Sequence, residues 1–323
     1  MAIKEGIIQR VSQDRWGRLL IHFLGKPYLA GSSLDEGIRT IAEHKRLGLL
    51  STLDILGESA RTKEAADGYL TVFKQAAEVL SAYSSTVSVK PSAICAVGAD
   101  GIELLPSTPL EPRLEEFVDY SGDCGVGVTL DMENHFWTDR SLRAAQVIWG
   151  EGHDNFGIVL QSRLNRTEKD IHMLFENGSY HLDRNQMRVR ACIGIYREPF
   201  DIATNDRTEA KRRLISRVGE LLRLGVHTEI ATHDHDVIRT IISGIIEPRG
   251  YPLSLFEFQF LKGVENAHQI QGELRDRGYT VRFYMPIELK EHDGDAYIGR
   301  RLLANPDLIQ HGIKNVLQMA IRF

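Results

Sequence analysis

The sequence has little of what marks secreted, membrane-spanning or disulfide-rich proteins. Its three cysteines, Cys95, Cys124 and Cys192, lie far apart and form no CxxC pair, which argues against a disulfide framework or a cysteine metal site. No run approaches the roughly 20 apolar residues that span a bilayer. Residues 1–18 carry charge throughout, unlike a signal peptide. We expect a cytoplasmic protein, with peripheral attachment to a membrane as the alternative.

Excess positive charge and linker sequences are also missing. The net charge is −5, so no basic field favours a nucleic-acid partner. The stretch EAKRRLISR is interrupted by apolar residues at helical spacing, which is typical of a solvated helix face. No low-complexity segment or Pro/Gly linker divides the chain. We therefore expect a single domain over residues 1–323, with a helical segment at 1–47, a barrel at 48–305 and a tail at 306–323.

What the sequence does contain is a repeated alternation of short apolar runs and helical patterns. Eight runs have the apolar or β-branched character of parallel strands that are buried on both faces. They are 49–56, 86–90, 125–131, 156–161, 187–193, 226–231, 255–259 and 280–284. This layout predicts an α/β fold of the (β/α)8 TIM-barrel type. A doubly wound sheet is the alternative, but no Gly-x-Gly-x-x-Gly follows any of the runs.

Helices are predicted between the strands and before the first one. Apolar positions such as Leu19, Leu20, Phe23 and Leu24 indicate an N-terminal helix. A second helix follows at 33–47, with Ser32 or Ser33 as N-cap and Glu36 as its capping partner. The remaining predicted helices are 62–83, 111–122, 138–149, 167–177, 206–224, 234–246, 264–277 and 296–304. The last of these carries the pair Arg300 and Arg301.

Polar residues stand in or directly after seven of the apolar runs. They are Lys90, Asp131, Gln161, Arg190, His233, Gln259 and Tyr284. The working residues of a (β/α)8 barrel lie at the C-terminal ends of its strands. One pocket should therefore gather these side chains, although they are scattered over almost 200 residues of sequence.

Three constellations leave their chemistry open. Arg300 and Arg301 could bind a carboxylate or phosphate through bidentate bonds, or be a surface pair. Asp131 and Glu133 could hold a metal, act as acid and base, or pair with arginines. His233 and His235 suggest a metal, but the first strand lacks the HxH pattern of amidohydrolase-type barrels, which makes the metal hypothesis weaker.

The segments taken together resemble the proline dehydrogenase family over roughly residues 47 to 305. The matching segments, in the family's order, are TLDILGE, SVKPSAI, LDMEN, VLQSRL, RACIGIY, ATHD, FEFQFLKG and FYMP…YIGRRLLAN. The resemblance implies FAD as cofactor and oxidation of L-proline to pyrroline-5-carboxylate by hydride transfer to flavin N5. It also implies an electron acceptor such as a quinone, and a separate downstream dehydrogenase for the product.

Residue roles follow from this resemblance position by position. Lys90, Arg300 and Arg301 match the residues that hold the substrate carboxylate. Asp131 matches a carboxylate that supports this cluster. The positions that match walls of the substrate pocket are Tyr196, Leu261, Tyr284 and Tyr297, and those assigned to the flavin are Gln161, Arg190, Gly194, Thr232, His233 and Gln259.

Four positions depart from the family pattern. Ile193 replaces a lysine, Asp234 an asparagine, Glu288 a glycine and Ala304 a glutamate, and one residue is inserted before Arg300. A divergent member could act on another cyclic or secondary amino acid, such as hydroxyproline. Two further hypotheses are a barrel metal hydrolase using Asp131 with the two histidines, and a non-catalytic relative that has lost flavin binding.

Overall fold

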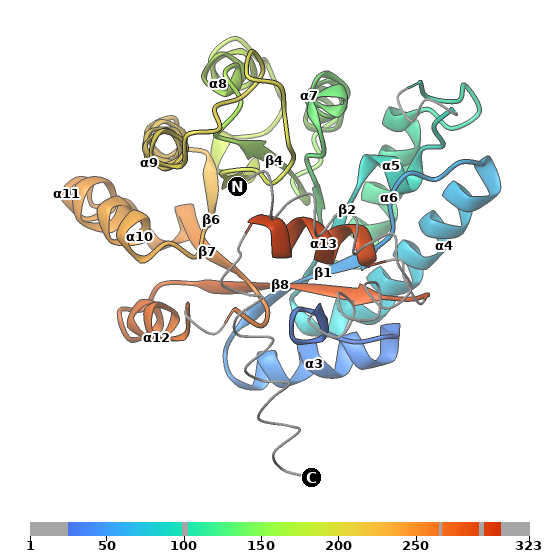
Figure 1. Cartoon of the computed structure of the whole chain (residues 1–323), viewed down its shortest axis with the longest axis horizontal. Coiled ribbons are helices and arrows are strands. Elements are labelled where there is room, and N and C mark those ends of the chain that lie inside the picture. The colour runs from blue at the N-terminus through green and yellow to red at the C-terminus, as the bar shows by residue number, and fades with distance from the viewer. Residues whose placement is uncertain (1–24, 99–102, 265–266, 291–293, 305–323) are drawn as a thin grey trace.

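Eight parallel strands close into a barrel in the order β1 to β8 (Figure 1). The computed structural model describes residues 25–98, 103–264, 267–290 and 294–304. The strands are β1 Leu50–Leu56, β2 Thr86–Val89, β3 Gly127–Leu130, β4 Phe156–Gln161, β5 Arg188–Cys192, β6 His227–Ala231, β7 Phe256–Leu261 and β8 Val281–Glu288. All eight predicted strands and the (β/α)8 architecture are confirmed.

The last two strands run further than predicted. The apolar pattern ended β8 at Tyr284 because Pro286 cannot donate a ladder hydrogen bond. In the structure β8 pairs with the whole of β1, from Leu50 opposite Arg282 to Leu56 opposite Glu288. Tertiary pairing therefore extends the strand through the proline. The carbonyl of Pro286 accepts a 2.6 Å hydrogen bond from the N–H of Ala30, which lies in the segment before α3.

Helices surround the barrel and begin where the sequence supplies caps. Ser33, Thr62 and Asp206 each accept a bond from a backbone N–H of the first helical turn, as expected of N-cap residues. The helices are α3 Leu34–Arg46, α4 Lys63–Leu80, α5 Pro91–Ile94, α6 Leu110–Asp123, α7 His135–Gly150, α8 Thr167–Phe175, α9 Arg207–Arg223, α10 His235–Ile241, α11 Glu247–Arg249, α12 His268–Asp276 and α13 Asp295–Ala304.

The shorter helical turns explain most differences from the predicted boundaries. The predicted helix 62–83 is α4 followed by the 3-10 turn η2 Ser81–Tyr83, and the predicted helix 234–246 is α10 followed by the π-helical turn η4 Ile242–Ile246. The other 3-10 turns are η1 Lys26–Tyr28, η3 Arg184–Gln186 and η5 Leu253–Leu255. The predicted helix around Leu19 to Leu24 and the tail 306–323 lie outside the described residues.

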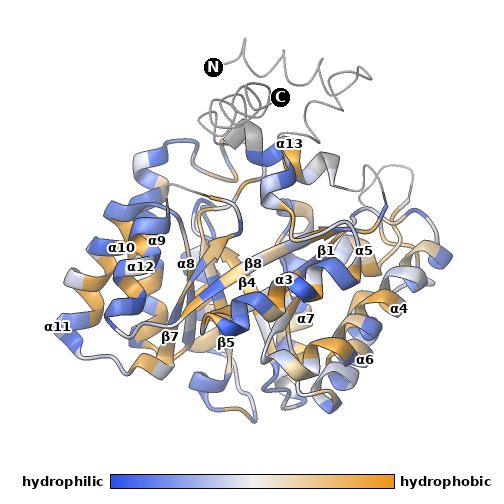
Figure 2. Cartoon of the chain, turned by 90° about the horizontal axis from the view of Figure 1, so that it is seen from below, coloured by the Kyte–Doolittle hydropathy of each residue, from blue (hydrophilic) through white to orange (hydrophobic). Residues whose placement is uncertain are grey.

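Helix α13 lies across the centre of the barrel in Figure 1, and the turned view of Figure 2 places it beyond the ends of the strands. We call this end, where the C-termini of the strands lie under α13, the mouth. The segment before α3 supports β8 from outside, because Gly31 forms a parallel bridge with Ile287. The fold thus brings the pair Arg300 and Arg301 over the strand ends that carry the predicted site residues.

Candidate active site at the barrel mouth

A buried lysine and two aspartates form the centre of the mouth. Lys90, which directly follows β2, places Nζ 2.6 Å from Oδ1 of Asp54 on β1 and 3.9 Å from Oδ2 of Asp131, which follows β3. Lys90 is 5% exposed and Asp54 is fully buried. Burial alone would lower the pKa of Lys90, but Asp54 and Asp131 outweigh it and raise that pKa, so the ammonium stays charged.

Asp131 links this centre to an arginine and a tyrosine. Its Oδ1 accepts a 2.8 Å bond from Nη1 of Arg190 on β5, and its Oδ2 accepts a 2.6 Å bond from the hydroxyl of Tyr284 on β8. The guanidinium of Arg190 lies 5.1 Å from the centre of the Tyr284 ring. Ser88 on β2 donates to Oδ1 of Asp131 and accepts from Arg190. Four strands therefore share one polar network.

Helix α13 adds two arginines, each against a tyrosine ring. Arg300 donates to both oxygens of Glu58, which follows β1, at 2.8 and 2.6 Å, and its guanidinium lies 5.0 Å from the ring centre of Tyr196. Arg301 lies 5.3 Å from the ring centre of Tyr297. Among the described residues, Nε of Arg301 and the Tyr297 hydroxyl are buried without hydrogen-bond partners. The two side chains lie against each other, and each keeps unused hydrogen-bonding capacity.

A third carboxylate in the mouth has an unusual protonation equilibrium. Burial raises the pKa of Glu133 to about 7, and the charge of Glu58 adds to the effect. Both carboxyl oxygens bond Ser92 on α5, one through the backbone N–H at 2.9 Å and one through the hydroxyl at 2.8 Å. Asp131 and Glu133, two apart in the sequence, thus have different partners and form no common metal site.

A cradle between β4 and β5 holds an amide oxygen without a partner. The Gln161 side chain donates from Nε2 to the carbonyls of Met132 and Glu133 at 3.1 and 2.8 Å, which fixes where its Oε1 points. That oxygen is buried and has no hydrogen-bond partner in the described part of the chain. Gly194 faces it with a φ of +100°, and a Cβ at this position would come within 2.3 Å of Oε1.

His233 has a second buried polar atom without a hydrogen-bond partner among the described residues. Its Nε2 accepts a 3.3 Å bond from the backbone N–H of Leu261, and its ring stacks on Phe260. Burial lowers the pKa of His233 to about 4, so the ring is neutral, and Nδ1 is buried without a partner among the described residues. The Thr232 hydroxyl accepts from the N–H of Asp234 at 3.2 Å, which leaves its own O–H free to donate.

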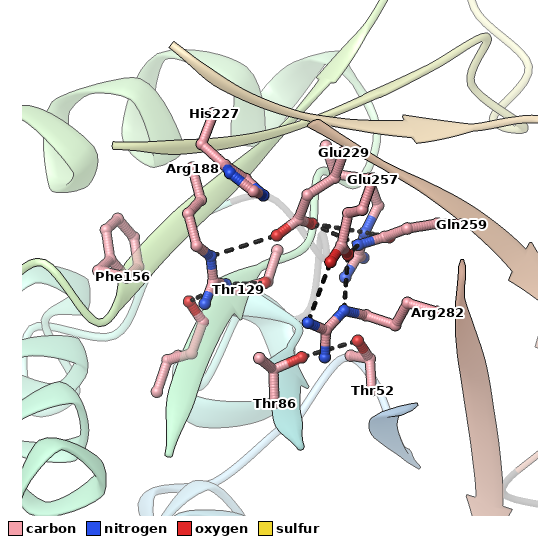
Figure 3. A network of polar contacts seen from close by, with 12 residues as sticks. Thr52, Thr86, Thr129, Phe156, Arg188, His227, Glu229, Glu257, Gln259 and Arg282 are labelled. Carbon is pink, nitrogen blue, oxygen red and sulfur yellow. Dashed lines mark hydrogen bonds and ion pairs between the residues drawn. The ribbon is translucent and has the colours of Figure 1, made fainter. Parts of the chain in front are cut away.

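Gln259 lies deeper in the barrel, in a network of arginines and glutamates (Figure 3). Its Oε1 accepts from Arg190, and its Nε2 donates to Glu229 on β6 and Glu257 on β7. Arg282 on β8 forms a bidentate pair with Glu257. These contacts occupy both ends of the Gln259 amide with protein partners.

The structure therefore brings most of the predicted residues together. Asp131 is hydrogen-bonded to Arg190 and Tyr284 and forms a 3.9 Å ion pair with Lys90. Gln161 with Gly194 and His233 with Leu261 form separate parts of the mouth. Five further residues of the mouth and barrel interior were not predicted from the sequence: Asp54, Glu58, Ser88, Glu229 and Glu257. A single acid inside an apolar run, as in TLDIL, TEIA or FEF, was the signal that could have found three of them.

The buried polar atoms without hydrogen-bond partners show what kind of cofactor would fit this site. The unpartnered buried atoms include an acceptor, Gln161 Oε1, and two donors, Arg301 Nε and the protonated Nδ1 of the neutral His233 ring, whose Nε2 accepts from Leu261. Such atoms cost free energy unless a ligand or water satisfies them. A planar cofactor with both donor and acceptor edges fits this set. By contrast, within the described residues no three His, Cys, Asp or Glu side chains converge as a metal site.

The site defines a class: a (β/α)8-barrel protein with a cationic mouth lined by tyrosines. The family model described as proline dehydrogenase matches residues 37–197. A proline dehydrogenase of Deinococcus radiodurans is 29% identical over 306 residues, covering 93% of this chain and 92% of that protein. Proline dehydrogenase 1 of Bacillus subtilis is 28% identical and covers 90% of each chain. The chain belongs to the proline dehydrogenase family.

Solved structures agree with the fold. The barrel aligns with proline utilization A (PutA) from Bdellovibrio bacteriovorus at a TM-score of 0.73 and 22% identity. The alignment covers 87% of this chain and 32% of the PutA chain, so this chain spans about a third of that protein. Among the described residues, no helix combines the length and apolarity needed to cross a bilayer.

The departures from the family pattern have local partners. Asp234 caps α10 through the N–H of Val237 at 3.0 Å and pairs with Nζ of Lys211 at 2.5 Å, so its added charge is balanced. Glu288 accepts a 2.8 Å bond from the N–H of Gly294, just before α13. Ile193 packs against the core. The side chain of Ala304 lies outside the described residues.

Proposed function

We propose that this chain is an FAD-dependent dehydrogenase that oxidises L-proline to pyrroline-5-carboxylate. The observation that carries the proposal is the grouping of Lys90, Arg300 and Arg301 at the mouth of a barrel of this family. Three cations, two of them arginines over tyrosine rings, suit a small molecule that has a carboxylate and an apolar ring.

Arg301 is the leading candidate for the carboxylate. Its Nε has no hydrogen-bond partner among the described residues, whereas Arg300 is paired with Glu58 and Lys90 with Asp54. A guanidinium has five N–H groups, so Arg300 can bind a second carboxylate while it keeps Glu58. Leu261, Tyr284, Tyr196 and Tyr297 are proposed as walls around the substrate ring.

The same cations would help to prepare the amine. A substrate that gives up a hydride from the carbon next to nitrogen needs that nitrogen unprotonated. Positive charges close to an amine disfavour its protonated form and lower its pKa. Lys90, with its raised pKa, keeps its own proton and stays a fixed charge rather than a base.

The cofactor is proposed to lie against Gln161, Gly194, Arg190 and His233. Gln161 Oε1 would accept a hydrogen bond from it, the N–H at His233 Nδ1 would donate one to it, and the missing side chain at Gly194 leaves room for its close approach. Arg190 would offer its positive charge. Bound FAD supplies the hydride acceptor, while the protein supplies orientation and charge. A quinone as electron acceptor and a separate dehydrogenase for the product complete the proposal.

The visible spectrum of the purified protein tests this function. We expect the absorption bands of an oxidised flavin, and we expect L-proline added without oxygen to bleach them. Trans-4-hydroxyproline tested in parallel separates proline from a related cyclic amino acid. A flavin that bleaches with hydroxyproline but not with L-proline would show that the substrate is a related cyclic amino acid and not proline. A protein that takes up no FAD would contradict the proposal and favour a binding-only relative.

A further inference from the structure

Gln259 is a neutral side chain whose amide bonds three charged groups in the barrel. Its Nε2 donates to Oε2 of Glu229 and to Oε1 of Glu257, both at 2.7 Å. Its Oε1 accepts from Nε of Arg190 at 2.6 Å. All four residues are at most 6% exposed. Figure 3 shows the Gln259 amide directed at the two glutamates.

These partners allow the amide one orientation. Turned by 180°, the amide would point its oxygen at two carboxylates and its N–H groups at a guanidinium N–H. Donors would then face donors and acceptors face acceptors, which is expensive in a buried site. The two glutamates are themselves held, because Arg188 pairs with Glu229 at 3.2 Å and Arg282 with Glu257 at 2.6 Å. Gln259 is therefore bonded to two glutamates whose own positions are fixed by arginines.

The charges around Gln259 are balanced. Three arginines, Arg188, Arg190 and Arg282, are matched by three acids, Asp131, Glu229 and Glu257. An amide adds two donors to this cluster without adding charge. A carboxylate in its place would leave a net negative charge beside Arg190, with little solvent to screen it.

Gln259 connects these two glutamates to the mouth, because it also bonds Arg190. Arg190 is held at Nε by Gln259 and at Nη1 by Asp131, while Nη1 and Nη2 both contact Ser88 at 3.1 Å. Four of its five N–H groups are thus directed by the described residues. Loss of the Gln259 bond would release the end of the guanidinium that is anchored to the barrel wall.

We propose that Gln259 is a positioning residue that sets the direction and the effective charge of Arg190 in the flavin site. The amide does not itself contact the cofactor, in contrast to the role that the family resemblance implied for it. This inference rests on the proposed function, because it assumes that Arg190 faces the flavin. It predicts effects on the bound flavin that exceed any effect on folding.

Flavin affinity and reduction potential test the proposal in four proteins: the wild type, Gln259→Met, Gln259→Glu and Thr52→Val. Methionine keeps the volume and loses every bond, so we expect FAD to bind about tenfold more weakly. Glutamate keeps the acceptor for Arg190 and loses both donors. We expect its flavin potential to be lower than that of the wild type, with the difference shrinking at acidic pH as the introduced carboxyl takes up a proton.

Thr52→Val is the matched control. It removes a buried 2.7 Å bond between Thr52 and Thr86 in the same part of the barrel without touching Arg190. We expect it to lower the melting temperature and to leave flavin affinity and potential unchanged. If Gln259→Met fails to fold, Gln259→Glu still gives the potential.

Two results would overturn the inference in different ways. Wild-type affinity and potential in both Gln259 variants, with only a lower melting temperature, would show a purely structural role while the proposed function stands. A wild-type protein that binds no FAD would remove the proposed function and this inference with it. Because the wild type is measured first, the two failures are distinguishable.

Discussion

Arg300 on the helix across the mouth and Glu58 after the first strand form a two-bond ion pair, with Nη1 to Oε1 at 2.8 Å and Nη2 to Oε2 at 2.6 Å. The pair joins α13 to the segment that follows β1, and so connects the two ends of the barrel sequence. Because Arg300 also lies over the Tyr196 ring, Glu58 holds the guanidinium between a carboxylate and an aromatic face. The geometry implies that Glu58 orients a substrate-binding cation.

Glu58→Gln should therefore weaken substrate binding. The amide retains one acceptor but loses the second bond and the countercharge, so Arg300 becomes less ordered. We expect KM for the substrate to rise several-fold, on the scale of one charge-assisted bond, with kcat changed less. Steady-state kinetics measure this. Glu64→Gln, at the exposed start of α4, is the control, and an unchanged KM in Glu58→Gln would mean that Arg300 is placed by other contacts.

Arg301→Met should have the larger effect on KM. Arg301 is the arginine whose Nε has no partner in the described chain, so its removal takes away a direct carboxylate contact. We expect KM to rise by about a hundredfold, which corresponds to two charge-assisted bonds, while FAD stays bound. Flavin content from the visible spectrum separates the two effects.

Arg301→Lys refines that test. Lysine keeps the charge but loses the planar fork that binds a carboxylate at two points, so an intermediate KM is expected. Substrate affinity that is unchanged in both variants would show that Arg301 does not bind the carboxylate. Loss of flavin in Arg301→Met would instead assign the residue to the cofactor.

The sequence predicted the fold well because barrel strands are short apolar runs with a polar residue at one end. Lys90, Asp131 and Arg190 could be placed at the mouth from that pattern alone. Their partners could not, because Arg190 meets Ser88 across 102 positions and Gln259 across 69. Local patterns do not encode which of many polar residues will meet.

Acids inside apolar strands were the main omission. Asp54, Glu229 and Glu257 look like interruptions of a hydrophobic run, yet each is buried and paired with a cation or an amide. Their positions follow from period-two alternation, which turns every second side chain into the barrel. Charged residues in such runs are therefore a signal of a polar barrel interior. The sequence did not reveal that Gln259 is part of this interior network.

Glu133 should make the stability of the protein depend on pH. Its pKa is raised from the ordinary 4.5 to about 7, so folding favours the protonated form. The resulting stability is fully present below the unfolded-state pKa and is lost as pH rises through about 7. We expect the free energy of unfolding to fall by about 3 kcal/mol across this window because of Glu133.

Glu133→Gln isolates that contribution. The amide is neutral at every pH and can bond Ser92 through both its oxygen and its nitrogen. Urea unfolding at about pH 5 and about pH 8 should show a smaller loss of stability in the variant than in the wild type. The difference between the proteins removes the contributions of Asp54 and other acids. Parallel pH dependence in the two proteins would mean that Glu133 is ionised at neutral pH.

Gly194→Ala tests the cradle beside Gln161. The φ of +100° at this position strains any residue with a Cβ, and that Cβ would lie 2.3 Å from the Gln161 oxygen. We expect a loss of about 1 to 3 kcal/mol in stability together with markedly weaker FAD binding, because Gln161 must move.

Gly48→Ala is the matched control for Gly194→Ala: its φ is +70°, and a Cβ there meets nothing within 4 Å. It should lose stability but keep wild-type affinity for FAD, as measured by titration of the apoprotein. Equal FAD affinities in Gly194→Ala and the wild type would place the cofactor away from this cradle.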